Sequence, residues 1–145
     1  MSVDLNQFIC FNFYKGWREI SSFYKDMLGN DVTPQNVYIL ELCDIKDKIT
    51  MNQLSKGMDL DGSAVSTLVA RMEKKSLVKR THGKEDRRTV FVQLTKEGEA
   101  LRTQLRQKTG LLTDCIRNQI SDEDVVKLQE MVTTIAKNRE KLHTE

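Results

Sequence analysis

A cysteine lies inside the most aromatic segment of the chain, QFICFNFYKGW at residues 7–17. The sequence has nine aromatic residues, and seven of them fall between residues 8 and 24. A cysteine thiolate is a nucleophile that oxidants attack, whereas a cysteine on an apolar helix is usually inert core. We expect this segment to be deeply buried together with Cys10, and both interpretations of the thiol remain open at this point.

A helical reading of this segment groups Cys10 with specific side chains. At about 100° per residue, Tyr14, Trp17 and Tyr24 fall on the same stripe as Cys10. Tyr14 is one turn away, so its phenol can hydrogen-bond an ionised or oxidised sulfur. Tyr24 lies about 21 Å farther along the axis and can approach only the Cys10 of a partner chain. We predict one helix from Asp4 to Leu28, which places Cys10 in the second turn, where the helix dipole favours a thiolate only modestly.

A second chemistry-bearing cluster is basic. Between Arg71 and Arg88 there are eight Lys or Arg residues and three acidic ones, a local charge of +5 on a chain whose net charge is +2. Such a stripe suits an anionic polymer such as double-stranded DNA, although a solvated face produces the same pattern.

Other kinds of chemistry find little support. Metal-ligand spacing, a phosphate-binding loop and a GxSxG nucleophile motif are absent from the sequence, which has only two histidines. We therefore expect no enzyme, no catalytic residue, no metal and no cofactor. The three cysteines, Cys10, Cys43 and Cys115, form no structural disulfide framework.

The hydrophobic pattern predicts the elements that position these residues. Helices are expected over 34–46, 51–57, 63–75, 96–119 and from 121 onward, and strands over 77–81 and 89–94 around a polar tip. A short helix, a tight turn, a second helix and a hairpin make a winged helix-turn-helix. The predicted fold class is therefore mainly α with a small β-hairpin wing, in a single domain over 1–145 with long helices at both ends.

The helix-turn-helix predicts which side chains meet DNA. The second helix of such a motif presents its N-terminal residues to base edges in the major groove. Small residues that allow close approach lie there: Ser63, Ala64, Ser66 and Thr67. Arg71 and Lys74 follow on the exposed side and suit phosphate contacts. Ser63 is also a candidate N-cap, a role that is compatible with DNA contact.

The hairpin tip offers two arginines for a different groove. Arg87 and Arg88 on a thin β-tip can enter a narrow minor groove, where the potential is most negative. Asp86 precedes Arg88 by two residues, and we predict that it orients the Arg88 guanidinium.

The run LSKGMDLDGSAVSTLVARMEKKSLVKRTHGKEDRRTVFVQLTKEGEAL resembles the core of a MarR-family repressor. The marks are EKKSLVKR before the wing, Asp86-x-Arg88 in its tip and LTKEG after it. The resemblance covers nearly the whole chain. It implies a homodimer on a pseudo-palindromic operator, with Arg88 in the minor groove braced by Asp86. It also implies that 33–95 is the DNA-binding part and that 1–30 and 96–145 are dimerisation helices.

The N-terminal run QFICFNFYKGWREISSFYKDML resembles the first helix of the organic-hydroperoxide-sensing, OhrR-type branch of this family. That resemblance implies that Cys10 is the oxidant-reactive residue, with Tyr14 and Trp17 beside it and Tyr24 contributed by the partner. Thr33 stands where the branch usually has a second partner tyrosine.

The same branch has two-cysteine members, and Cys115 in LLTDCIRNQ resembles their resolving cysteine. The implied chemistry oxidises Cys10 to sulfenic acid and then forms an intersubunit disulfide with Cys115, which releases DNA. Cys43 has no matched role, and we interpret it as core.

Two alternatives remain. The chain could be a MarR-type repressor gated by a small aromatic acid or lipophile between the dimer helices, with Cys10 merely lining a pocket. It could also be a dimerisation module that does not bind DNA. The first residues lack a signal peptide and no apolar run approaches the roughly 20 residues of a membrane span. We expect a cytoplasmic protein without a membrane partner.

Overall fold

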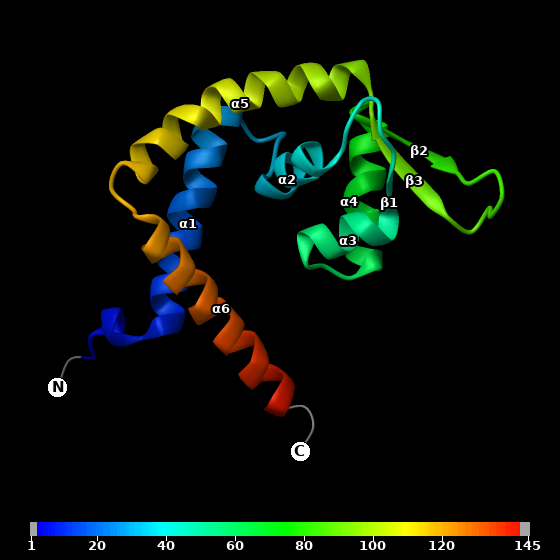
Figure 1. Cartoon of the computed structure of the whole chain (residues 1–145). Helices are drawn as coiled ribbons and strands as arrows, with labels where there is room; N and C mark the ends of the chain where they lie inside the picture. The colour runs from blue at the N-terminus through cyan, green and yellow to red at the C-terminus, as the bar shows by residue number, and fades with distance from the viewer. Residues whose placement is uncertain (1–2, 143–145) are drawn as a thin grey trace. The chain divides into compact units, whose positions relative to one another are not determined.

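The structure is a computed structural model that describes residues 3–142 (Figure 1), apart from the side chains of residues 111–113 and 115. The chain divides into two compact units, residues 1–107 and 108–145. The boundary falls inside one helix, and each unit is described by itself.

The described elements follow the predicted order of helices and strands. They are η1 (Leu5–Gln7), α1 (Ile9–Leu28), α2 (Pro34–Leu42), β1 (Ile49–Thr50), α3 (Met51–Met58), α4 (Gly62–Lys74), β2 (Val78–His82), β3 (Val90–Leu94), α5 (Lys96–Arg117) and α6 (Asp122–Leu142). The mainly α fold with a winged helix-turn-helix is therefore confirmed.

The N-terminal helix is not continuous, and the prediction of one helix from Asp4 was wrong. The Asp4 carboxylate accepts the Asn6 N–H at 3.0 Å and starts a separate 3-10 turn. Phe8 is then extended, with φ −92° and ψ 124°, and α1 begins only at Ile9. The side-chain amide of Asn12 donates to the carbonyls of Asn6 and Phe8, which ties the two pieces together.

Helix α2 ends at Leu42, four residues before the predicted end. Cys43 adopts an extended conformation, with φ −90° and ψ 156°. The Asp44 carboxylate accepts the N–H groups of Lys46 and Asp47 and so stabilises a turn in place of a further helical turn.

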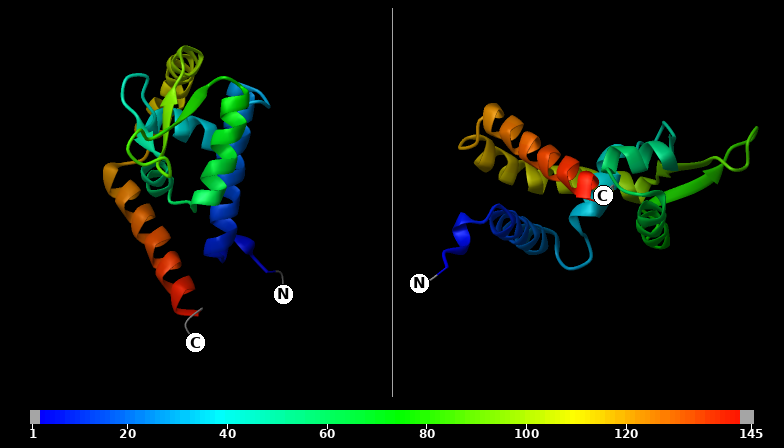
Figure 2. Two further views of the ribbon diagram at one scale, coloured as in Figure 1. Left: turned by 90° about the vertical axis from the view of Figure 1, so that its right-hand side faces the viewer. Right: turned by 90° about the horizontal axis from the view of Figure 1, so that it is seen from below.

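The sheet contains a strand that the sequence analysis missed. The order is β1-β3-β2, all antiparallel, with Ile49 opposite Val92 and Val78 opposite Leu94. A two-residue strand has no measurable alternation, so β1 carries no periodic signal. The β2–β3 hairpin extends away from α3 and α4, as the right-hand view of Figure 2 shows.

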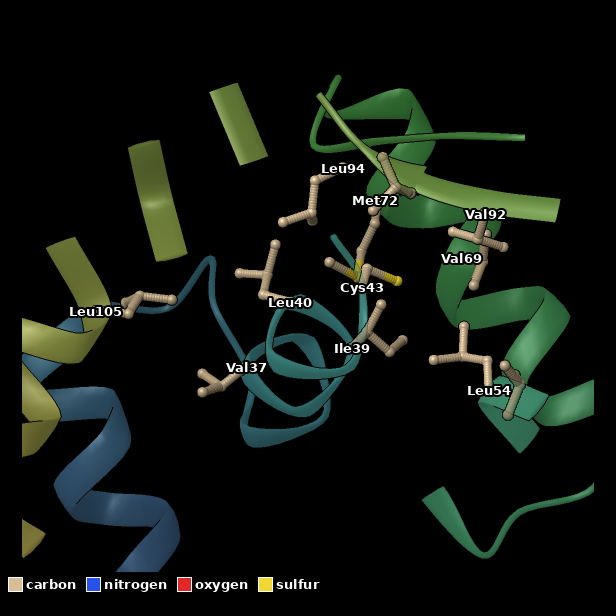
Figure 3. Packing of buried hydrophobic residues seen from close by; sticks show 12 residues of the cluster. Val37, Ile39, Leu40, Cys43, Leu54, Val69, Met72, Val92, Leu94 and Leu105 are labelled. Carbon is tan, nitrogen blue, oxygen red and sulfur yellow. The ribbon is translucent and has the colours of Figure 1, made fainter. Parts of the chain in front are cut away.

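The core of the first unit joins α2, α3, α4 and β3 (Figure 3). Apolar residues of four elements are almost fully inaccessible: Ile39, Leu40, Leu54, Val65, Val69, Met72, Val92 and Leu94. Val92 and Leu94 are buried on the face that the alternating pattern predicted. Because α4 presents its buried stripe to this core, the opposite stripe faces solvent.

In the second unit, α6 begins as the sequence predicted. The Ser121 hydroxyl accepts the Asp124 N–H at 3.2 Å, and the Asp124 carboxylate accepts the Ser121 N–H at 3.0 Å. This capping box starts a 21-residue helix. Across residues 3–142, we find no helix with the length and apolar character of a membrane span.

Candidate nucleic-acid interface and cysteine site

The start of α4 is set by an aspartate. Asp59 ends α3 in the left-handed conformation, with φ 52° and ψ 44°. The Asp61 carboxylate then accepts the Ala64 N–H at 2.9 Å, so Asp61 and not Ser63 is the N-cap of α4. Capping therefore does not occupy the Ser63 hydroxyl.

One exposed line runs along α4. Ser63, Thr67, Arg71 and Lys74 succeed one another at helical spacing and are all exposed, whereas Ala64 and Ser66 are half-buried. The Thr67 hydroxyl donates to the Ser63 carbonyl at 3.1 Å. The structure thus brings the small polar residues and the two cations onto one accessible face.

The wing tip is a tight turn organised by Asp86. Its carboxylate accepts the Arg88 backbone N–H at 2.9 Å and the Thr89 hydroxyl at 3.3 Å, and its carbonyl accepts the Thr89 N–H at 3.1 Å. The tip closes tightly at Gly83, where an added Cβ would lie 2.5 Å from the Asp86 carbonyl oxygen.

The prediction that Asp86 orients the Arg88 guanidinium is therefore wrong for this structure. Asp86 holds the Arg88 backbone, and among the ion pairs of the described residues none joins the two side chains. Arg87 and Arg88 both extend into solvent.

The basic stripe separates into structural and free cations. Arg80 makes a bidentate ion pair with Glu73, and the Lys75 ammonium donates to the Asp31 carbonyl at 2.6 Å. The other six basic residues are exposed, and residues 3–142 give them no ion pair: Arg71, Lys74, Lys79, Lys84, Arg87 and Arg88. The free cations lie on the outer face of α4 and along the wing.

Cys10 occupies a different environment from the predicted one. It is exposed, as are Tyr14 and Trp17, and α1 buries none of its residues within the chain. The expectation of deep burial is wrong for the single chain. Because α1 begins at Ile9, Cys10 lies in the first helical turn and not in the second, and the N-cap residue Phe8 makes no side-chain hydrogen bond there.

The other predicted sensing residues lie elsewhere on the chain. Tyr24 packs against the core, and burial raises the pKa of its phenol, with smaller contributions from Tyr38 and Glu41. The Thr33 hydroxyl accepts the Asn36 N–H at 3.3 Å, so it caps α2. Neither residue is brought to Cys10 of its own chain, since Tyr24 is fourteen residues away on the same helix.

The structure describes the side chain of Cys43 but not that of Cys115. Cys43 is 1% exposed, which confirms it as core, and burial raises its pKa to about 11 even though Arg102 lowers it in part. Cys115 is part of helix α5, and its side chain lies outside what the structure describes.

Sequence reasoning missed two arginines of α5 that hold α2. The Arg102 guanidinium is buried and donates to the carbonyls of Leu40 at 3.4 Å and Cys43 at 2.7 Å. Arg106 makes a bidentate ion pair with Glu41, with its closest contact at 2.7 Å. Contacts over about 60 residues of sequence leave no local pattern, so no signal in the chain could have found them.

The remaining chemistry is sparse. Over the described residues, no cluster of three or more His, Cys, Asp and Glu side chains could hold a metal ion. The geometry is thus an exposed basic surface on a helix and a hairpin, with a thiol on a separate aromatic helix.

Comparisons with known proteins agree with this geometry. Residues 30–89, which contain the helix-turn-helix and the wing tip, match the sequence model of the MarR family. Over these residues, the winged helix-turn-helix is therefore similar to that of the MarR family. The chain is 28% identical over 135 residues to the organic hydroperoxide resistance transcriptional regulator of Bacillus subtilis strain 168, covering 92% of this chain and 90% of that protein.

Two solved structures share the fold of this chain. The PcaV transcriptional regulator of Streptomyces coelicolor, in complex with its natural ligand, has a TM-score of 0.79 at 14% identity and covers 94% of this chain and 97% of its own. The MepR–DNA complex of S. aureus has a TM-score of 0.76 at 21% identity, with 90% and 98% covered. The two solved structures show the fold, and the sequence similarities are to the MarR family and to a transcriptional regulator.

Proposed function

We propose that this chain is a homodimeric repressor that binds a pseudo-palindromic operator with α4 in the major groove and Arg88 in the adjacent minor groove. The observation that carries the proposal is the continuous set of unpaired cations on α4 and the wing. Arg71 and Lys74 suit phosphates, and Arg87 and Arg88 stand at the end of a thin hairpin.

The dimer has a separate source of support. Large apolar side chains of α1 and α6 remain 41–63% exposed in the single chain: Ile9, Tyr14, Trp17, Ile20, Val125, Val126, Leu128, Met131, Val132 and Ile135. Exposed apolar side chains gathered on one helix mark an interaction site, and α1 and α6 each carry such a set. A second copy of the chain would cover the two sets and would remove the aromatic residues near Cys10 from water.

The regulator is proposed to respond to an organic hydroperoxide or another oxidant through Cys10. In the first step, the Cys10 thiolate attacks the distal peroxide oxygen; the O–O bond breaks, the alkoxide takes a proton, and Cys10 becomes sulfenic acid. The thiol of Cys115 from the partner chain then displaces water and forms a disulfide. Exposure of Cys10 and its place in the first turn of α1 support the first step.

Forming this disulfide constrains the dimer. The two Cα atoms must come within about 7 Å. Any helix movement that achieves this would change the spacing of the two α4 helices, and the operator would be released.

The DNA part is tested with a duplex selected by the protein from a random library. Arg88→Ala should weaken binding about fivefold or more, since a well-placed base or groove contact is worth about 1–3 kcal/mol. Lys127→Ala, which removes a cation from α6, is the matched control and should bind as the wild type does. Equal affinity of the Arg88 variant and the wild type would contradict the placement of the wing.

The role of Asp86 gives a finer test. Because Asp86 accepts backbone and hydroxyl hydrogen bonds, an amide oxygen can replace its carboxylate. Asp86→Asn should retain most of the affinity and Asp86→Ala should lose it. If both variants bind equally weakly, the carboxylate acts through its charge, as an ion pair with Arg88 would require.

The redox part is tested by non-reducing electrophoresis with peptide mapping. Reduced wild type and Cys115→Ser are treated with a small molar excess of cumene hydroperoxide while bound to the selected duplex. A covalent dimer that maps to Cys10 and Cys115, accompanied by DNA release and absent from the variant, would support the sensor. Cys10 that stays reduced on protein that still binds DNA would eliminate it.

A ligand-gated repressor is the second candidate, and one cavity favours it. A groove of about 570 Å³ lies between the loop before α2 and the exposed side of α4. Leu68 and Met72 line it together with Arg71, Lys74 and Lys75, so an amphipathic acid would find both apolar and cationic contacts. Release of DNA by such an acid from a Cys10→Ser variant would favour this function over oxidation.

A further inference from the structure

Glu73 and Arg80 join the recognition helix to the wing. Glu73 lies in the last turn of α4 and Arg80 in the middle of β2. The Nε and Nη2 atoms of Arg80 donate to one carboxylate oxygen of Glu73 at 2.9 Å and 2.7 Å. The backbone N–H of Arg80 donates to the other oxygen at 3.1 Å. One residue therefore occupies both oxygens of this carboxylate, and these contacts hold the pKa of Glu73 below its ordinary value.

The backbone contact shows that this pair is more than two adjacent charges. β2 is an edge strand, because β3 pairs with it on one side only. The Arg80 N–H points to the open edge, where Glu73 accepts it. The Glu73 carboxylate thus accepts the N–H that a neighbouring strand would otherwise accept, and this bond to the Arg80 main chain holds the base of the wing.

A short turn joins the two elements along the chain, and Val78 of β2 is buried in the same core as Val69 and Met72 of α4. α4 ends at Lys74 and β2 begins at Val78. Within the turn, Ser76 has a positive φ of 58°, and the Leu77 N–H donates to the Met72 carbonyl at 3.0 Å. The ion pair adds a polar connection at the open edge of β2, beside the turn and the core contacts, and it resists rotation of the wing about its base.

We propose that Glu73 and Arg80 are positioning residues for DNA recognition, which set the angle between α4 and the wing so that Arg88 reaches the minor groove while α4 occupies the major groove. The inference rests on the proposed placement of both elements on DNA. At about 3.3 Å per strand residue, the wing tip lies roughly 17 Å from Arg80, so a 10° rotation at the base moves the tip by roughly 3 Å. That displacement is as long as a hydrogen bond and would remove the contact.

A direct phosphate contact is the competing role for Arg80. The two roles predict opposite effects of removing Glu73. If Arg80 binds phosphate, Glu73 is an unfavourable negative charge near DNA, and its loss should tighten binding. If the pair positions the wing, its loss should weaken binding although the protein becomes more positive.

The experiment measures affinity for the selected duplex as a function of salt for Glu73→Met, Arg80→Met and the double variant. We expect each single variant to bind about tenfold more weakly and the double variant to be no worse, because partners in one ion pair are not additive. The salt dependence should match that of the wild type, since no phosphate contact is removed. Glu85→Met is the matched control: it removes an exposed carboxylate at the wing tip and should bind as tightly as the wild type or more tightly.

A double-mutant cycle that combines Glu73→Met with Arg88→Ala distinguishes a positioning role of Glu73 from a general loss of folding. Arg88→Ala should cost much less in the Glu73→Met background than in the wild type, because the displaced wing no longer presents that arginine. Circular dichroism at the assay temperature shows that each variant is folded.

Three results would overturn the inference. Tighter binding by Glu73→Met would do so. A salt slope reduced by about 1.8 in Arg80→Met would do so as well, because each lost phosphate contact lowers the slope by about 0.9 and the dimer carries two copies of Arg80. An undiminished cost of Arg88→Ala in the Glu73→Met background would also reject positioning while leaving the wing on DNA. If Arg88→Ala has no effect on the affinity of the otherwise wild-type protein, the proposed placement of the wing on DNA is wrong as well. The effect of Arg88→Ala alone therefore distinguishes a failure of the positioning role from a failure of the proposed function.

Discussion

Replacing Arg102 by methionine should unfold the chain more easily, because Arg102 supplies hydrogen bonds to the C-terminal end of α2. Its guanidinium donates to the carbonyls of Leu40 and Cys43, which would otherwise have no donor at the end of that helix. The side chain is 9% exposed and also pairs with Glu99 and Asp44. Methionine retains most of the apolar stem and none of the donors.

The expected cost follows from these contacts. Each buried polar group left without a partner costs about 1–3 kcal/mol. Part of this is offset, since methionine needs no desolvation of a charge and removes the Arg102 Nε, which is buried without a partner among the described residues. We expect the free energy of unfolding to fall by about 2–3 kcal/mol for Arg102→Met.

Arg106→Met is the matched control, because Arg106 lies one turn farther along α5 and also pairs with α2. Its ion pair with Glu41 is exposed, at 56% and 40% for the two side chains. An exposed pair contributes at most about 1 kcal/mol. The two variants have the same change in composition and differ in burial.

The assay is urea unfolding followed by circular dichroism at one protein concentration, since the stability of a dimer depends on concentration. The midpoint should shift with an unchanged slope. A loss for Arg102→Met within about 0.5 kcal/mol of the loss for Arg106→Met would refute the reasoning, because burial would then not decide the value of the arginine.

Two further predictions concern packing and thiols. Gly98→Ala should destabilise the fold by about 1–3 kcal/mol in thermal unfolding, because its Cβ would lie 2.0 Å from the Leu77 carbonyl oxygen, whereas Gly110→Ala, with nothing within 4 Å, should be neutral or stabilising. At pH 8, iodoacetamide should alkylate the exposed Cys10 of native protein and leave the buried Cys43 unmodified until urea is added. Since burial raises the pKa of Cys43 from 9.0 to about 11, unfolding releases its proton in this range, and stability should decline as pH rises from 9.0 to about 11. Rapid native labelling of Cys43, or equal melting temperatures of the two glycine variants, would contradict these assignments.

The sequence alone determined the order of the longer helices and strands, because that order rests on local signals. Hydrophobic periodicity placed α4 and β3, and the predicted helix starts near residues 96 and 121 agree with caps in the structure. The Thr95 hydroxyl accepts the Gly98 N–H at 3.0 Å, and Ser121 forms a capping box with Asp124. Signals of this kind act within four residues, so they can be read along the chain.

Part of the candidate interface could also be predicted from local sequence signals. The exposed line on α4 follows from the helical period once Val65, Val69 and Met72 are assigned to the core. The start of the line was not predictable, since Asp61 and Ser63 are both good N-caps and only the turn conformation decides between them.

Only the tertiary structure decided which charges remain available. Arg80 and Lys75 belong to the same basic run as Arg71 and Lys74, yet the first two are used within the fold and the last two are free. All four residues carry the same positive charge, so composition does not distinguish the cations that are used within the fold from those that are free. The difference depends on which acceptor the fold brings within hydrogen-bonding distance, as with Asp31, 44 residues away from Lys75.

The environment of Cys10 shows the same division. Its neighbours along the helix were predicted from the period. The break at Phe8 depends on two side-chain hydrogen bonds that compete with helical ones: the Asp4 carboxylate accepts the Asn6 N–H, and the Asn12 amide donates to the Phe8 carbonyl. That break moves Cys10 to the first turn. An aromatic sequence indicates a surface that prefers to be covered, whereas exposure of that surface in one chain is decided by how the rest of the chain packs.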